Sequence, residues 1–200
     1  MRFLAGFLTG LALAALSGVL LLRNAGGFSA REAPGTLEVW AAGTARRLSL
    51  PAGARDQRNP VPDSPEVLSE AKEHWADHCA SCHANNGSGD TVLGKGMFPP
   101  APDMRLPGTQ GQTDGELFFA IQNGVRHTGM PAWGSPGDAG TDSWKLVRLI
   151  RYLPRLTFEE QKQMEKMNPK SEQERLEEER EEKFLRGESD DAPTAAHRHH

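Results

Sequence analysis

Residues 79–83 read Cys-Ala-Ser-Cys-His, the most informative stretch of this 200-residue chain. Three-residue spacing places the thiols of Cys79 and Cys82 about one helical turn apart, near the separation of the two vinyl groups of a haem. The histidine that follows is then placed to offer a ring nitrogen to the iron. A zinc site would need two further ligands of suitable spacing, the sequence has no third cysteine, and a redox Cys-x-x-Cys pair rarely carries this histidine. We therefore predict one covalently attached haem c, held by Cys79, Cys82 and His83.

The sixth coordination position of such an iron needs a second ligand, and Met130 is the best candidate. It lies in the segment Gly-Met-Pro-Ala-Trp-Gly at 129–134. The glycine before it and the proline after it favour an extended loop from which a thioether can project. A single methionine more often only fills a core, but the nearby haem motif and the Gly-Met-Pro setting favour a ligand here. Met97 and Met104 are weaker competing candidates.

Three segments together resemble small class I c-type cytochromes: the motif at 79–83, the Pro-Pro-Ala-Pro-Asp run at 99–103 and the segment at 129–134. The likeness is in particular to the single-haem domains of bacterial membrane-bound respiratory complexes, such as the cytochrome subunits of cbb3-type oxidases. It covers roughly residues 64–156.

The resemblance implies an all-α haem domain whose first and last helices cross and close the haem pocket. It also implies that a proline carbonyl, of Pro99 or Pro100, accepts a hydrogen bond from the other nitrogen of the axial histidine, which fixes the ring. Trp133, in the same segment as Met130, is expected to contribute to the haem site.

Helix starts are marked at several places along the chain. Ser64, followed by proline and glutamate, predicts a helix whose apolar face leads to the cysteines through Leu68, Ala71 and Trp75. Further starts are expected at Thr113, at Thr141 or Asp142, at Thr157 and at Ser171. The helix from 141 or 142 has an apolar stripe formed by Leu146, Leu149, Ile150 and Leu153. His74 and His78 lie on the first helix, where surface or packing roles are expected.

The N-terminal segment from residue 3 to 22 carries no charge and is flanked by Arg2 and Arg23. As a helix it would be about 30 Å long, the thickness of a bilayer core. A cleaved signal peptide is the alternative, but its apolar region is usually shorter. We favour an uncleaved, single-pass anchor in the bacterial cytoplasmic membrane. Because c-type haem is attached outside that membrane in the bacteria this chain resembles, the haem domain is expected on the periplasmic or extracytoplasmic side.

These patterns divide the chain into five parts: an anchor (1–23), a linker (24–63), the haem domain (64–156), a charged helical extension (157–187) and a disordered tail (188–200). In the linker a short amphipathic helix is expected, with Leu37, Trp40, Ala41, Thr44 and Leu48 on one face. It could lie on the membrane, dock on a partner or pack against the haem domain. Removal of everything after Leu156 is expected to leave the haem domain intact. The tail ends with His197, His199 and His200, a weak candidate for binding copper or zinc.

The expected function is one-electron transfer between partner proteins of a respiratory chain, as a carrier or as a subunit of a complex rather than as an enzyme in its own right. The net charge of −4, with no basic stripe interleaved with aromatic residues, argues against a nucleic-acid partner. The alternative is a haem-based sensor or small-ligand-binding protein in which the methionine ligand is displaced.

Overall fold

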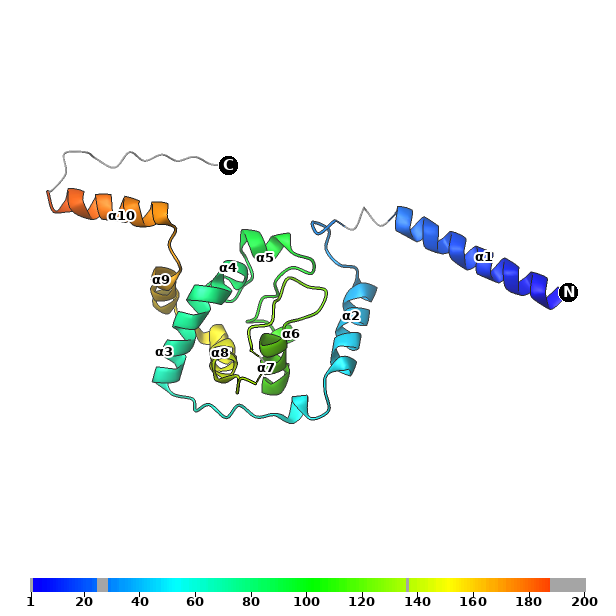
Figure 1. Cartoon of the computed structure of the whole chain (residues 1–200), viewed down its shortest axis with the longest axis horizontal. Helices are drawn as coiled ribbons and strands as arrows, with labels where there is room; N and C mark the ends of the chain where they lie inside the picture. Colours follow the sequence, from blue (N-terminus) through cyan, green and yellow to red (C-terminus); the bar gives the residue numbers. More distant parts are fainter. Residues whose placement is uncertain (1, 25–28, 136, 188–200) are drawn as a thin grey trace.

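Helices form all the regular structure in the residues that the computed structural model describes, 2–24, 29–135 and 137–187, and this confirms the all-α class. Figure 1 shows a bundle of short helices between two outlying ones. In chain order the elements are α1 (Arg2–Arg23), α2 (Thr36–Ser49), η2 (Ala54–Asp56), α3 (Pro65–His74), η3 (Trp75–Cys79), α4 (Ala80–His83), α5 (Val92–Gly96), α6 (Pro107–Gln110), α7 (Asp114–Asn123), α8 (Thr141–Tyr152), η4 (Leu153–Arg155), α9 (Phe158–Met167) and α10 (Glu172–Leu185).

The haem motif is delivered by an unbroken helical segment, α3–η3–α4. Ser64 caps it as expected, because its side-chain oxygen accepts a hydrogen bond from the backbone N–H of Val67 at 3.3 Å. The α-helix widens into a π-helical turn at η3 and tightens again before His83. Ala84 then has a φ of 59° and a ψ of 159°, a conformation that residues other than glycine rarely adopt, and the helix ends directly after the histidine.

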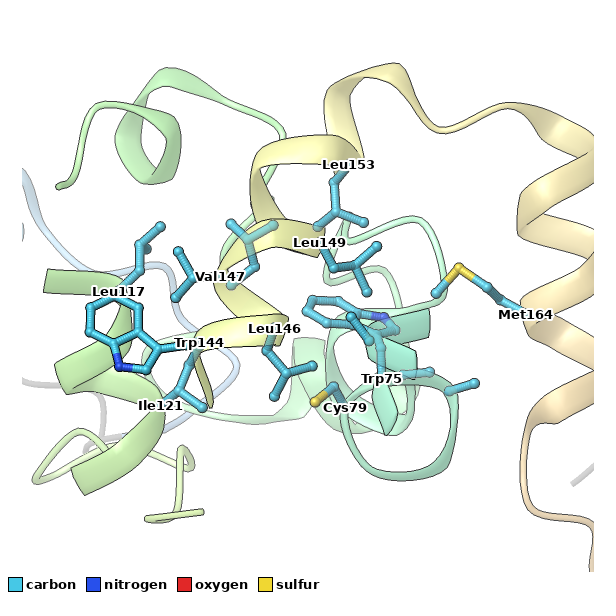
Figure 2. Packing of buried hydrophobic residues seen from close by; sticks show 14 of the residues in the cluster. Trp75, Cys79, Leu117, Ile121, Trp144, Leu146, Val147, Leu149, Leu153 and Met164 are labelled. Carbon is cyan, nitrogen blue, oxygen red and sulfur yellow. The ribbon is translucent and has the colours of Figure 1, made fainter. Parts of the chain in front are cut away.

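The core lies where α8 crosses α3 and packs beside α7 (Figure 2). The predicted stripe of α8 is confirmed, since its four members are at most 2% exposed: Leu146, Leu149, Ile150 and Leu153. Burial of each such side chain stabilises the fold by about 1.5–3 kcal/mol. On the α7 side, the rings of Phe118 and Trp144 stack with centroids 4.0 Å apart.

The packed domain begins earlier than the expected boundary at residue 64. Ala54 is buried against the first turn of α7. The two segments are so close that a Cβ added to Gly115 would lie 1.9 Å from the Ala54 carbonyl oxygen. Arg55 forms an ion pair with Glu116 at 2.8 Å. Asn59 donates a hydrogen bond to the carbonyl of Trp144 at 2.8 Å. The segment expected as a linker over 24–63 is therefore part of the domain from about residue 54 onward.

The packed domain also ends later than the expected boundary at residue 156. Helix α9 lies against α3 and η3, and Met164 is fully buried in the core. Lys72 forms an ion pair with Glu160 at 2.7 Å, and the hydroxyl of Tyr152 donates to the same carboxylate at 2.9 Å. The expected extension over 157–187 thus has two parts: α9 belongs to the domain, whereas every residue of α10 is exposed.

The two N-terminal helices lie outside this core. Helix α1 is long and apolar enough to cross a membrane, and none of its residues is buried. Helix α2 contains the residues expected on one face of a helix in the linker, and it also has no buried residue. Its hydrogen bond to the domain joins Arg46 Nη2 to Gln112 Oε1 at 3.1 Å. The three tail histidines lie outside the described residues.

Candidate functional site

The two cysteines of the motif occupy different environments. Cys79 is 9% exposed and belongs to the core cluster, whereas Cys82 on α4 is half-buried. Both are free thiols. Burial, together with the nearby Cys82, raises the pKa of the Cys79 thiol to about 12. Neither side chain is used in a disulfide, so both thiols remain free to form thioethers.

The imidazole of His83 is buried, with 8% exposure. The ring of Trp75 lies against it, with centroids 5.8 Å apart, and the indole N–H donates to the carbonyl of Ala84 at 3.0 Å. Burial lowers the pKa of His83, so the ring is neutral at pH 7, the form that binds a metal. Its Nδ1 atom is buried and has no hydrogen-bond partner. Its neighbours hold the ring in position, but they give Nδ1 no hydrogen-bond partner.

The loop that carries Met130 is held by its own backbone. The N–H of Val125 donates to the Met130 carbonyl at 3.1 Å, and the N–H of Met130 donates to Thr128 Oγ1 at 3.1 Å. Beyond it, the N–H of Trp133 donates to the carbonyl of Ile121 on α7 at 3.1 Å. The Met130 side chain is half-buried and packs against the core cluster, as a thioether projecting from a loop would.

Contacts bring this loop next to the haem motif. The ring of His78, which directly precedes Cys79, lies 5.3 Å from the ring of Trp133, centroid to centroid. Met97 also packs against this loop, because a Cβ added to Gly129 would be 1.9 Å from the Met97 sulfur. Three predicted segments therefore meet at one place: the turn before the motif, the loop with Met97 and the loop with Met130.

The remaining predicted residues are less closely tied to the site. Pro99 and Pro100 are both exposed, and the hydrogen bond predicted between one of their carbonyls and His83 is not formed in the structure. Their loop is held instead by the N–H of Ala101, which donates to the carbonyl of Gly94 at 2.9 Å. Met104, the other competing thioether, packs against the core cluster.

The distribution of exposed apolar side chains fits a haem beside the motif. Among the described residues of the packed domain, 54–135 and 137–167, seven large hydrophobic side chains are exposed. Five of them belong to α5 and the loops that follow the motif: Val92, Leu93, Phe98, Leu106 and Trp133. A macrocycle is a large apolar body that can cover such side chains. Together with the buried, neutral and unsatisfied ring of His83, this distribution meets the requirements of a bound haem.

Sequence reasoning missed several residues that shape the site. Trp75 was recognised only as a core residue, although an aromatic side chain two turns before His83 could have suggested ring contact. Thr91 fixes the end of the motif helix, because its hydroxyl donates to the carbonyl of Cys82 at 3.1 Å. Neither this bond nor the approach of Met97 to Gly129 has a local sequence signal.

Comparison with known proteins supports this reading of the site. Residues 66–153 match the family described as cytochrome C oxidase, cbb3-type, subunit III. The matched span contains Cys79, Cys82, His83 and Met130. Among curated proteins, none matched the chain. The family match shows that residues 66–153 form a class I c-type cytochrome domain of the cbb3 type, a family that binds covalently attached haem c.

Proposed function

We propose that this protein is a membrane-anchored monohaem cytochrome that passes single electrons between partner proteins of a respiratory chain. The observation that carries the proposal is the state of His83, which is buried, neutral and lacks a partner for Nδ1. A neutral imidazole can offer one ring nitrogen, Nε2, to iron. The bare Nδ1, which costs about 1–3 kcal/mol while it is unsatisfied, would gain its hydrogen bond in the haem-bound protein.

Each site residue has a role in this proposal. Cys79 and Cys82 would hold the haem covalently, and His83 and Met130 would bind its iron. The bound haem c supplies a one-electron couple. With His83 and Met130 both bound to the iron, no position would be left open for substrate chemistry, and ligation by a methionine would favour the ferrous state. The hydrogen-bonded loop around Met130 limits ligand movement when the charge changes.

The haem environment is completed by neighbouring side chains. Trp133 packs on His78 and so connects the methionine loop to the turn before the motif. Pro99 or Pro100 is proposed to accept a hydrogen bond from the free nitrogen of His83 in the haem-bound protein, which would satisfy the group that lacks a partner here. These residues would orientate the ligands.

The membrane part of the proposal is supported by α1, a helix of 22 residues with no buried member. We propose that it remains uncleaved and that the haem domain lies on the extracytoplasmic side. Confined there, the protein would exchange electrons with membrane-bound complexes, as a diffusing carrier or as a fixed subunit.

Two measurements on the purified protein test the proposal. The denatured chain should retain haem through acid–acetone extraction, and Cys79→Ala with Cys82→Ala should lose it. Loss of all haem from the wild-type chain would overturn covalent attachment. The ferrous protein should also bind carbon monoxide poorly, because Met130 occupies the sixth position. Ready, tight binding would instead favour the alternative, a sensor with a displaceable methionine.

A further inference from the structure

We propose that α2 lies flat on the surface of a lipid bilayer and holds the haem domain there in one orientation. The inference rests on the proposed anchoring by α1 but goes beyond it, because an anchor alone would leave the domain free to rotate on a tether. It concerns a surface of this chain that the haem site does not use.

Helix α2 carries an apolar stripe with no cover in the structure. At 100° per residue, Leu37, Ala41 and Leu48 lie within about 40° of one another around the helix, and Trp40 and Thr44 flank them. Leu37 is 74% exposed, Trp40 65% and Leu48 82%. Exposure of this apolar surface to water costs about 25 cal/mol of free energy for each Å².

The stripe faces away from the haem domain. Arg46 lies about 180° around the helix from Leu37, and its guanidinium contacts the domain through Gln112. Its charge also acts on Glu116, on the first turn of α7. Because this side of α2 is turned to the domain, the stripe on the other side is presented outward.

A bilayer is the occupant that the surroundings favour. Only residues 24–35 separate α1 from α2, and a chain of that length reaches at most about 40 Å. Figure 1 shows α2 on the side of the domain towards α1. An inserted α1 would thus keep the stripe close to the lipid surface, where even weak binding is effective because it is intramolecular.

The flank of the stripe has the chemistry of a membrane interface. Trp40 and Arg47 lie about 20° apart on one side of it. An indole is favoured at the level of the lipid headgroups, and a guanidinium on a long stem can reach lipid phosphates. Glu38 is the single acidic residue of α2.

Contact between α2 and lipid would orientate the whole domain. Only residues 50–53 separate α2 from η2, and η2 is fixed to α7 by the burial of Ala54 and by the ion pair between Arg55 and Glu116. The short connection and the contact of Arg46 leave α2 little freedom to move relative to the domain. The first turn of α7 would therefore face the membrane.

Spin labels on the full-length holoprotein in vesicles of phosphatidylcholine and phosphatidylglycerol test this inference. Because the haem consumes both native thiols, an introduced cysteine is the only free one. Leu37→Cys and Leu48→Cys report the stripe, and Val39→Cys, exposed but near Arg46 around the helix, is the matched control. Labels on the stripe should collide more often with lipid-soluble oxygen than with a water-soluble nickel complex, and the control label should show the reverse.

The outcomes separate the possibilities. The inference would be overturned if the labels on the stripe were as accessible to the nickel complex as the control label. It would also be overturned if those labels were shielded from both oxygen and nickel, because this would indicate contact with protein. A label at Leu11→Cys in α1 tests the anchor independently. If that label lies in lipid while the stripe lies in water, the inference on α2 fails and the anchor stands. If the label at Leu11 lies in water or is absent from the mature protein, the proposed anchoring itself fails.

Discussion

The thioether of Met130 is the residue on which the electronic character of the site depends. Replacement by alanine removes the proposed sulfur ligand while the hydrogen bonds of its loop, which use the backbone, can remain. We expect Met130→Ala to abolish the weak long-wavelength absorption of ferric methionine-ligated haem and to lower the reduction potential, because thioether ligation favours ferrous iron. Absorption spectroscopy and redox titration measure both effects.

Met97 and Met104 provide matched controls, because each is also a methionine near the motif. Met104→Ala removes a core contact and should leave the absorption band in place. Met97→Ala removes the side chain that lies against Gly129, so the band should persist but the ligand should be displaced more easily by added imidazole. Disappearance of the band in either control with its retention in Met130→Ala would show that the ligand is misassigned.

Glu160 gives the domain a dependence on acid. Burial by itself raises the pKa of this carboxyl, but hydrogen bonds from Lys72, the Thr157 backbone and Tyr152 prevail and lower it to about 2, from 4.5. A lowered pKa stabilises the folded state above about pH 4.5, and this contribution is lost as the pH falls towards 2. Glu160→Gln should therefore cost about 1.5–3 kcal/mol at pH 7, typical of bonds to a charged group.

Urea unfolding at neutral and at acid pH measures this effect. The difference between wild type and Glu160→Gln should shrink as the pH falls below 4.5. Glu159→Gln, on the exposed side of the same helix, is the control and should have little effect. An equal cost of Glu160→Gln at both pH values would show that the carboxylate charge is not responsible.

At the level of elements, α9 is expected to be structural. Truncation after Leu156 would remove the fully buried Met164 and the partner of Lys72, so the thermal midpoint should fall. Met164→Ala alone should cost about 2–5 kcal/mol, the range for deletion of a buried methionine side chain. Truncation after Met167, which keeps α9, is the control, and calorimetry of the holoproteins compares them. If both truncated proteins melt like the full chain, α9 contributes nothing to the domain.

Helix α10 is expected to act on association instead. Its residues are all exposed, and the segment 172–186 has seven glutamates against four basic residues. Truncation after Met167 should leave the haem spectrum unchanged but slow electron exchange with partner-containing membranes at low salt. The difference should vanish at high salt, since screening at 0.1 M acts beyond about 10 Å. Equal rates at every ionic strength would exclude steering by α10.

The helix starts were predictable because each depends on a few neighbouring residues. The side-chain bonds expected at Thr113, Thr157 and Ser171 are all formed as capping boxes. The packing of α9 was not predictable in the same way, because its inward face contributes one buried side chain, Met164, and two neighbouring helices complete the contact. A single methionine in a charged helix gives no periodic signal.

For the site, too, only the features encoded by consecutive residues could be predicted. The motif at 79–83 and the loop at 129–134 carry their chemistry in consecutive residues. The contacts that join them, between His78 and Trp133 and between Met97 and Gly129, connect residues far apart in the sequence. Such contacts follow from how the helices cross, which no local pattern specifies.

For the whole molecule, the fate of the first helix decides where electron transfer occurs. We expect the mature protein to begin at or near Met1 and to remain with membranes in high salt, because a helix of 22 residues spans the bilayer core. Terminal sequencing of the membrane fraction measures this. A mature terminus between Ala15 and Ser29 would identify the segment as a signal peptide.

The enclosure of Cys79 restricts the order in which the protein can be made. Its side chain lies in the core, and α9 packs against the turn η3 that ends with it. Because the chain is synthesised from its N-terminus, both cysteines are present before Met164 has been added. Because a thiol in the core is poorly accessible, we expect haem to be joined to Cys79 before the domain has folded completely. A chain that folds before haem arrives should then be a poorer acceptor of haem than an unfolded one.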